Sequence, residues 1–234
     1  MSVETDFRAL LAVHEAGHGL LYGLLFGQVP QEVKINVASF DGGYNSYMSL
    51  RAESRRNCLD TICVSLAGRA AEALVFGEDA CTTGAEQDFT QATAEAAQFV
   101  RRHGFAGRLS RTDVTVDIEE DLNTDMAPTN DAIEALLAEQ YARAIRLLQE
   151  HSAIFLRITE ALSQRGEVSK HDLAAWLGLR VASEPSVLEP YADRLAAFSA
   201  RQGVSGKLAA REREAVSLVP ILEGITAGPV CCPA

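Results

Sequence analysis

The most constraining feature of the sequence is a long apolar run, residues 10–27, that contains three ionisable side chains. These are His14, Glu15 and His18, which form an H-E-x-x-H motif. The run has the composition of a buried helix, and residues four apart share one helix face, so both imidazoles can reach one ion. Burying these groups unpaired would cost on the order of several kcal/mol, and a bound metal removes that cost. The run therefore predicts a metal site on a core helix.

The spacing of the motif is typical of catalytic zinc sites. Such a site takes three protein ligands and leaves a fourth position to water. Glu15 follows the first histidine and is placed to accept a proton from that water. A structural zinc site would use four ligands, mostly cysteines, but the five cysteines of the chain form no C-x-x-C pair. The motif therefore favours a catalytic zinc ion.

The third zinc ligand must come from farther along the chain. Leu21 and Leu24 occupy the places where a metzincin has its glycine and third histidine. Glu72 would provide a glutamate on a following helix, a known zinc arrangement. Asp88 falls in the first turns of the next predicted helix. The chemistry of the residues leaves Glu72 and Asp88 both open, with two further candidates, Glu86 and His103.

The net charge and the cysteine content limit which partners the protein can bind and in which cellular compartment it is expected. The net charge of −11 argues against nucleic acid, because phosphates would be repelled. Scattered cysteines in an odd number fit a reducing compartment, so we expect a cytoplasmic protein. The run 10–27 is barely long enough to span a membrane, and its three ionisable groups oppose insertion. We therefore expect a soluble chain with no membrane span.

A short hairpin is predicted directly after the first helix. Val33, Ile35 and Val37 alternate with polar neighbours in residues 31–38, which indicates a half-buried strand. A turn at residues 41–43 then leads into a returning strand at residues 44–50. Strands beside a zinc cleft can hold an extended peptide by edge pairing, so these three residues are our predicted substrate-binding residues. The alternative is a hairpin that only covers the core.

The remaining pattern is mostly helical, so the predicted fold class is mainly α with a small β-sheet (α+β). After Gly178 the character changes, because five of the seven prolines lie beyond it. We therefore predict a zinc peptidase domain at residues 1–178 and an appendage or flexible tail at 179–234. Apolar periodicity predicts helices at residues 5–27, 53–76, 83–102, 130–149, 152–164, 169–177 and 191–201.

Several motifs, taken together, resemble a known family. HEAGH, LAGRAAEALVFG, TTGAEQDFTQAT and VRRHGFAG resemble, in order and spacing, the peptidase domain of the FtsH family of membrane AAA+ zinc proteases. The helical stretch EQYARAIRLLQEHSAIFLRITEAL resembles the helical end of that domain. The resemblance covers about residues 7–177 and implies an FtsH-peptidase-like helical zinc metalloprotease domain.

The resemblance also assigns roles to residues. It implies that His14, His18 and Asp88 bind one zinc ion per chain and that Glu15 is the catalytic base. Glu72 would then hydrogen-bond the second ring nitrogen of a ligand histidine and orient it. The alternative for Glu72 is an ion pair with Arg69 on the same helix.

We expect from these features a zinc metalloendopeptidase that cuts unfolded or flexible polypeptide segments. Family members work as hexamers in which an ATPase ring feeds the peptidase ring. The transmembrane segments and ATPase module of the family do not occur in the 234 residues. We therefore expect ATP-independent cleavage, with a homo-oligomer or a separate ATPase as the partners the resemblance suggests. The alternative is a peptidase-fold binding or regulatory module with little turnover, partnered with a separate ATPase.

Overall fold

The computed structural model describes residues 3–36, 42–47, 50–107, 109, 127–181 and 187–201. The chain divides into two units, Met1–Leu188 and Glu189–Ala234. The first unit is mostly helical with a small three-stranded sheet, so the predicted fold class is confirmed. In the second unit the structure describes Glu189–Arg201, which includes the helix α8 (Tyr191–Arg201). The domain boundary expected at Gly178 stays a prediction.

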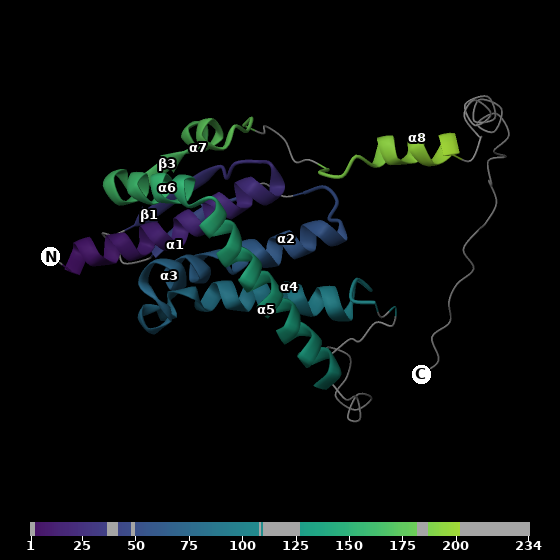
Figure 1. Ribbon diagram of the computed structural model, residues 1–234, viewed down its shortest axis with the longest axis horizontal. Coiled ribbons are helices and arrows are strands. Elements are labelled where there is room, and N and C mark those ends of the chain that lie inside the picture. The colour runs from purple at the N-terminus through teal and green to yellow at the C-terminus, as the bar shows by residue number, and fades with distance from the viewer. Residues whose placement is uncertain are drawn as a thin grey trace, which may run out of the picture. The chain divides into compact units, whose positions relative to one another are not determined.

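Helix α1 (Val3–Phe26) is the centre of the first unit. It packs against α3 (Ala67–Phe76) on one side and α6 (Ser152–Arg165) on the other (Figure 1). Among the described helices, α1 alone has the length and mean hydropathy, 1.3, of a membrane span. However, 67% of the apolar 18-residue stretch that has this hydropathy is buried within the protein, as in the core helix of a folded domain. The apolar run is therefore the core helix that its composition predicts.

Three glycines of α1 allow its neighbours to approach closely. A side chain at Gly17 would collide with the backbone of α3, because its Cβ would lie 2.6 Å from the Ala67 carbonyl oxygen. Gly19 faces Val33 of the sheet, and Gly23 faces Leu177. Glycine lowers helix stability by about 1 kcal/mol relative to alanine. The three glycines therefore do not serve the stability of the helix; they allow α1 to lie close to the elements that surround it.

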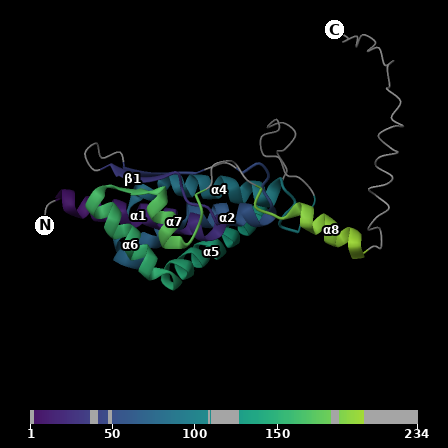
Figure 2. The ribbon, with the colours of Figure 1, turned by 90° about the horizontal axis from the view of Figure 1, so that it is seen from above.

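The sheet has the strand order β2-β1-β3, and both pairs are antiparallel. Strands β1 (Glu32–Asn36) and β2 (Gly42–Ser46) form the predicted hairpin. Strand β3 (Glu167–Ser169) is not apparent in the sequence pattern, and it pairs with the other edge of β1. Figure 2 shows the sheet along one side of the helices. Strand β1 is therefore the central strand.

This arrangement corrects the predicted substrate-binding residues. Val33 is fully buried and Ile35 is 9% exposed, and both belong to the main hydrophobic core. Because β1 has a partner strand on each side, its residues 32–34 have no free edge for a peptide. Edge pairing of substrate along this part of β1 is therefore wrong, and Val37 lies outside the described residues.

The helix predicted at residues 53–76 is in fact two helices. Helix α2 (Arg55–Ser65) ends one residue before Leu66, which caps it, and α3 starts directly after Leu66. Helix α4 (Glu86–Arg101) follows two short 3₁₀ turns, Glu78–Ala80 and Thr83–Ala85. The other predicted helices are α5 (Ala127–Glu150), α6 and α7 (Lys170–Leu177).

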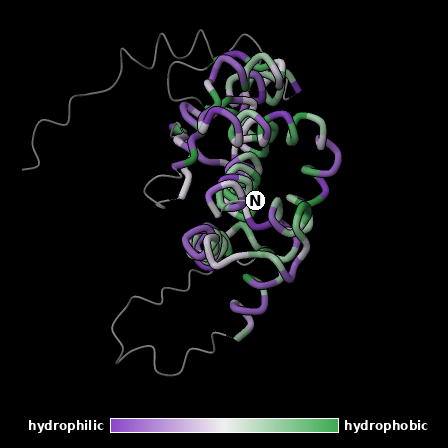
Figure 3. The backbone as a smooth tube through the Cα atoms, turned by 90° about the vertical axis from the view of Figure 1, so that its left-hand side faces the viewer, coloured by the Kyte–Doolittle hydropathy of each residue, from purple (hydrophilic) through white to green (hydrophobic). Residues whose placement is uncertain are grey.

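Two hydrophobic clusters fix the helices that carry the site. The main cluster surrounds α1, and a smaller one lies between α2, α4 and α5, with Ile62, Phe99 and Ile133 among its members. Hydrophobic and hydrophilic residues alternate along the helices, as expected when one face of each is buried (Figure 3). Helix α1 is thus fixed by one cluster and α4 by the other.

Candidate metal centre

Two histidines of α1 present the same ring nitrogen to one point. His14 Nδ1 lies 2.7 Å from Glu72 Oε1, and His18 Nδ1 lies 2.8 Å from the Val64 carbonyl oxygen. Both partners are acceptors, so each Nδ1 donates its hydrogen to them, and each Nε2 is left as the atom that can bind a metal once it has lost its proton. The two Nε2 atoms are 3.1 Å apart. The second hydrogen bond of each ring therefore prepares it to bind a metal.

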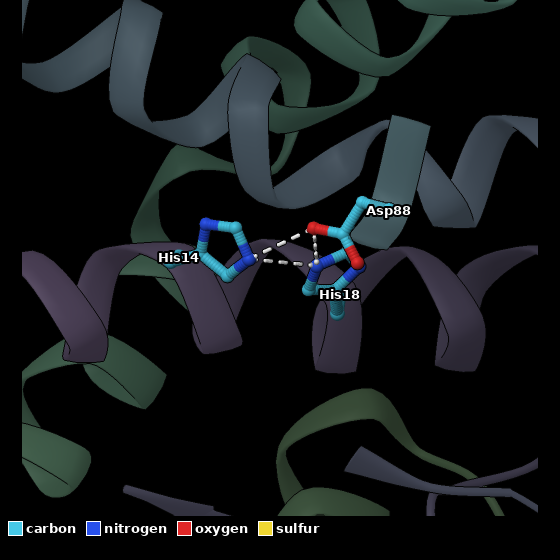
Figure 4. A group of neighbouring side chains, drawn as sticks. All are labelled: His14, His18 and Asp88. Carbon is cyan, nitrogen blue, oxygen red and sulfur yellow. Dashed lines mark hydrogen bonds and ion pairs between the residues drawn. The ribbon is translucent and has the colours of Figure 1, made fainter. Parts of the chain in front are cut away.

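Asp88 brings a carboxylate to the same point from α4. Its Oδ2 atom is 3.0 Å from His14 Nε2 and 3.1 Å from His18 Nε2 (Figure 4). Ligand atoms around a tetrahedral zinc ion, with bonds of about 2.0–2.1 Å, lie roughly 3.3 Å apart. Two imidazole nitrogens and one carboxylate oxygen are also a donor set that zinc accepts. These three side chains fit a single zinc ion.

Gly68 of α3 leaves the space that the two rings occupy. A Cβ atom at this position would collide with His14 Nε2 and Cε1 and with His18 Nε2. Any larger residue would therefore push the imidazoles out of their positions. The sequence pattern suggests only tight helix packing for Gly68, whereas in the structure it borders the three-residue cluster.

Glu72 connects His14 to the turn before α4. Its side chain is 1% exposed, and its Oε2 accepts hydrogen bonds from Thr82 N at 2.8 Å and Thr82 Oγ1 at 3.2 Å. Burial would raise the pKa of Glu72, but the hydrogen bonds from His14 and Thr82 outweigh it, and the pKa is lowered. Arg69 donates instead to the Thr82 carbonyl oxygen at 3.1 Å. Glu72 thus contacts a histidine of the cluster while Arg69 lies against the turn.

The charges around the cluster favour a cation. Burial lowers the pKa of His14, but hydrogen bonds to Asp88 and Glu72 outweigh it and raise the pKa to about 10. Burial acts against ionisation of Asp88, yet the two histidines hold its pKa well below the usual range. Glu15 adds a third carboxylate beside the rings. Three carboxylates around two imidazoles leave an excess of negative charge, which a divalent cation would neutralise.

Glu15 lies beside this cluster and is only 6% exposed. Its Oε2 atom accepts a hydrogen bond from Asn45 Nδ2 of β2 at 2.5 Å. Burial raises the pKa of Glu15, and the two histidines and Asn45 partly oppose that shift. A carboxylate with a raised pKa is better suited to exchange a proton near neutral pH.

The cluster opens into a cavity of about 870 Å³. Its walls come from α1, α2, α3, α4 and β2, including Tyr22, Asn45 and Gln91, and from Tyr47 directly after β2. Val33 and Ile35 do not line it. Of the other third-ligand candidates, Glu86 is exposed and His103 lies beyond the far end of α4, against Phe105. The structure thus brings together His14, Glu15, His18, Glu72 and Asp88.

Sequence reasoning missed the contacts that strand β2 makes with Glu15. Residues 41–43 predict only a turn, and Asn45 stands in a strand with no recognisable motif. The one available signal was an asparagine two residues after a glycine, which places both on the same strand face.

These features define a three-residue cluster on a helical domain that could hold one metal ion, with a buried carboxylate beside it. Residues 1–175 match the family described as Peptidase family M41, and the chain belongs to this family. The resemblance to the FtsH peptidase domain is thereby confirmed.

Relatives from distant organisms are similar to the chain. The ATP-dependent zinc metalloprotease FtsH of Synechococcus sp. (strain JA-2-3B'a(2-13)) is 30% identical over 185 residues, which cover 72% of this chain and 29% of that protein. The FtsH of Thermus thermophilus is 32% identical over 171 residues, covering 68% and 27%. The YME1 homolog of Schistosoma mansoni, also named an ATP-dependent zinc metalloprotease, is 31% identical over 171 residues, covering 71% and 26%. The chain therefore spans less than a third of each of these relatives.

Proposed function

We propose that this chain is a zinc-dependent metalloendopeptidase that hydrolyses peptide bonds in unfolded or flexible polypeptide segments. The observation that carries the proposal is the convergence of His14 Nε2, His18 Nε2 and Asp88 Oδ2, with Glu15 beside them in one cavity. We also propose that cleavage needs no ATP, and the casein assay described below tests this. We further propose a separate ATPase partner, because the named relatives are ATP-dependent, and homo-oligomerisation, which the family resemblance implies.

In the proposed reaction each residue has a separate task. His14, His18 and Asp88 would hold one zinc ion, which when bound supplies a Lewis acid that polarises the scissile carbonyl and acidifies water. Glu15 accepts the proton of the attacking water on its carboxylate and delivers it to the leaving amine. Glu72 and the Val64 carbonyl keep the imidazoles in the required tautomer and orientation.

Strand β2 is the proposed docking edge for the substrate. Among the described strands, β2 pairs on one side only, and its residues 42–45 line the cavity. Strand β3 is the other edge, but its residues do not line the cavity. An extended peptide that pairs with β2 would lie beside Glu15. Such pairing requires an exposed, extended backbone, so the proposed substrates are unfolded or flexible segments.

The test measures zinc content and the cleavage of casein without ATP in the purified chain. We expect one zinc per chain and measurable cleavage. Glu15→Gln should keep zinc and lose cleavage by at least about 100-fold, because Gln cannot accept the proton. Asp88→Ala should lose both zinc and cleavage.

Glu86→Gln is the matched control, because Glu86 is an exposed carboxylate on the same turn of α4. Cleavage retained by Glu15→Gln would contradict the proposed mechanism. Bound zinc without any cleavage would favour the alternative, a binding or regulatory module that keeps the peptidase fold.

A further inference from the structure

Strand β2 contacts Glu15 from two positions on one strand face. Asn45 donates from Nδ2 to Glu15 Oε2 at 2.5 Å and to the Glu15 backbone carbonyl oxygen at 3.3 Å. Gly43 stands two residues earlier and so points to the same side of the strand. One amide group therefore holds both the side chain and the backbone of Glu15.

Gly43 is needed for space at this contact. An ideal Cβ at Gly43 would lie 2.6 Å from Glu15 Oε1 and 2.7 Å from Glu15 Cδ, closer than such atoms approach in real structures. The neighbouring Gly42 has a φ of +82°, whereas Gly43 is not among the glycines with positive φ. The backbone at Gly43 would thus accept any residue, and it is the Glu15 carboxylate that excludes a side chain.

When Asn45 donates from Nδ2 to Glu15, its Oδ1 atom is left without a partner in the part of the chain that the structure describes. Within the described residues, the buried Asn45 Oδ1 atom has no hydrogen-bond partner. Leaving a buried acceptor unpaired is unfavourable for stability. The reverse amide orientation would place Oδ1 against the carboxylate, which is worse. A leucine of similar shape would avoid the unpaired acceptor, so the asparagine is better explained by Glu15 than by the stability of the sheet.

We infer that β2 positions the general base, with Asn45 fixing Glu15 Oε2 and Gly43 leaving Oε1 uncovered for proton transfer. Within the described residues, Oε1 accepts no hydrogen bond. Asn45 is therefore a positioning residue, not a catalytic one. The inference rests on the proposed function, because it assigns Glu15 the role of base. It also makes the strand proposed to bind substrate the one that orients the base.

The test compares the whole chain with its Asn45→Leu variant, which keeps the shape and removes the donor. We expect kcat for a peptide substrate to fall by about 10- to 100-fold, with KM changed less than twofold and zinc content unchanged. The melting temperature should stay the same or rise, because the unpaired Oδ1 is removed. Asn36→Leu, an exposed asparagine of the neighbouring strand, is the control and should leave kcat unchanged.

A crystal structure of Asn45→Leu gives a second readout that needs no turnover. We expect the Glu15 carboxylate to leave its position, and a carboxylate that stays in place would overturn the inference. Unchanged kcat in a zinc-loaded, active chain would also overturn it, and so would a lower melting temperature with parallel loss of zinc, which indicates a structural role. If Asn45→Leu does not fold, Gly43→Ala tests the same contact, because its methyl group must displace Glu15.

These outcomes are separate from failure of the proposed function. That proposal fails when the unmodified chain and Glu15→Gln behave alike toward casein. In either case, the crystallographic position of Glu15 in the Asn45→Leu variant shows whether Asn45 holds the Glu15 carboxylate in place.

Discussion

The two walls of the cavity hold their side chains in different ways. The helical wall, which includes His14, His18 and Glu72 of α1 and α3 and is backed by Gly68 of α3, fixes each imidazole by a second hydrogen bond and by close helix contact. The sheet wall, formed by Gly43 and Asn45 of β2, fixes Glu15 through a single amide. The difference suggests a division of labour: the helical wall determines metal affinity, and the sheet wall determines the rate of the chemical step.

The largest effect on zinc affinity is expected for a substitution at Gly68, which disturbs the helical wall. In Gly68→Ala the new methyl group meets both imidazoles, so we expect zinc affinity to fall by about 100-fold or more. A competition titration against a chromophoric chelator measures this, with circular dichroism to follow unfolding. Ala73→Ser, at a partly exposed position of the same helix, is the control. Zinc affinity equal to that of the unmodified chain would show that the wall is not rigid there.

A smaller effect is expected when the helical wall keeps its shape and loses a charge. Glu72→Gln weakens the hydrogen bond to His14 and places an amide donor opposite Thr82, so we expect zinc affinity to fall about 10- to 100-fold. The same chelator competition measures it. Glu78→Gln is the matched control, because Glu78 is an exposed carboxylate nearby that accepts from Tyr141. An equal effect in both variants would mean that general charge, not orientation of His14, is responsible.

The smallest effect is expected for Ile35→Val, which tests whether β1, unlike β2, contributes only to the stability of the sheet. Ile35→Val removes one buried methylene group from the core face of β1, so we expect the free energy of unfolding to drop by about 1 kcal/mol. Chemical denaturation measures this, and KM and kcat should not change. A raised KM with unchanged stability would return Ile35 to the substrate-binding residues.

The parts of the site that the sequence predicted are local ones. His14, Glu15 and His18 follow from helix periodicity alone, because their relative positions are fixed within one turn of α1. Asp88 lies 70 positions after His18, so its place depends on how α4 packs, and the chemistry of the residues could not separate it from Glu72. The family resemblance assigned the ligand role to Asp88. In the structure Asp88 lies against both histidines, while Glu72 supports one of them.

The sheet shows what hydrophobic periodicity can and cannot predict: it indicates which face of a strand is buried but not which strands pair with it. Alternation in β1 correctly indicated one buried face, and Val33 and Ile35 lie on it. It carried no information about the partners of the strand, because β3 comes from more than 130 positions later in the chain. The contacts of Gly43 and Asn45 with Glu15 were missed for the same reason, since they join β2 to a helix that precedes it by about 30 positions.

Helix α1 belongs both to the main hydrophobic core of the domain and to the wall of its cavity. Leu20 and Leu21, fully buried in the main core, stand within one turn of His18. The histidines therefore cannot separate from a bound ion without disturbing the helix on which the domain is assembled. Ligand occupancy and global unfolding are thermodynamically linked in such a case: an ion at 1,000 times its Kd adds about 4 kcal/mol to the free energy of unfolding. The resistance of the whole domain to heat and to proteolysis would then report the concentration of available metal around it.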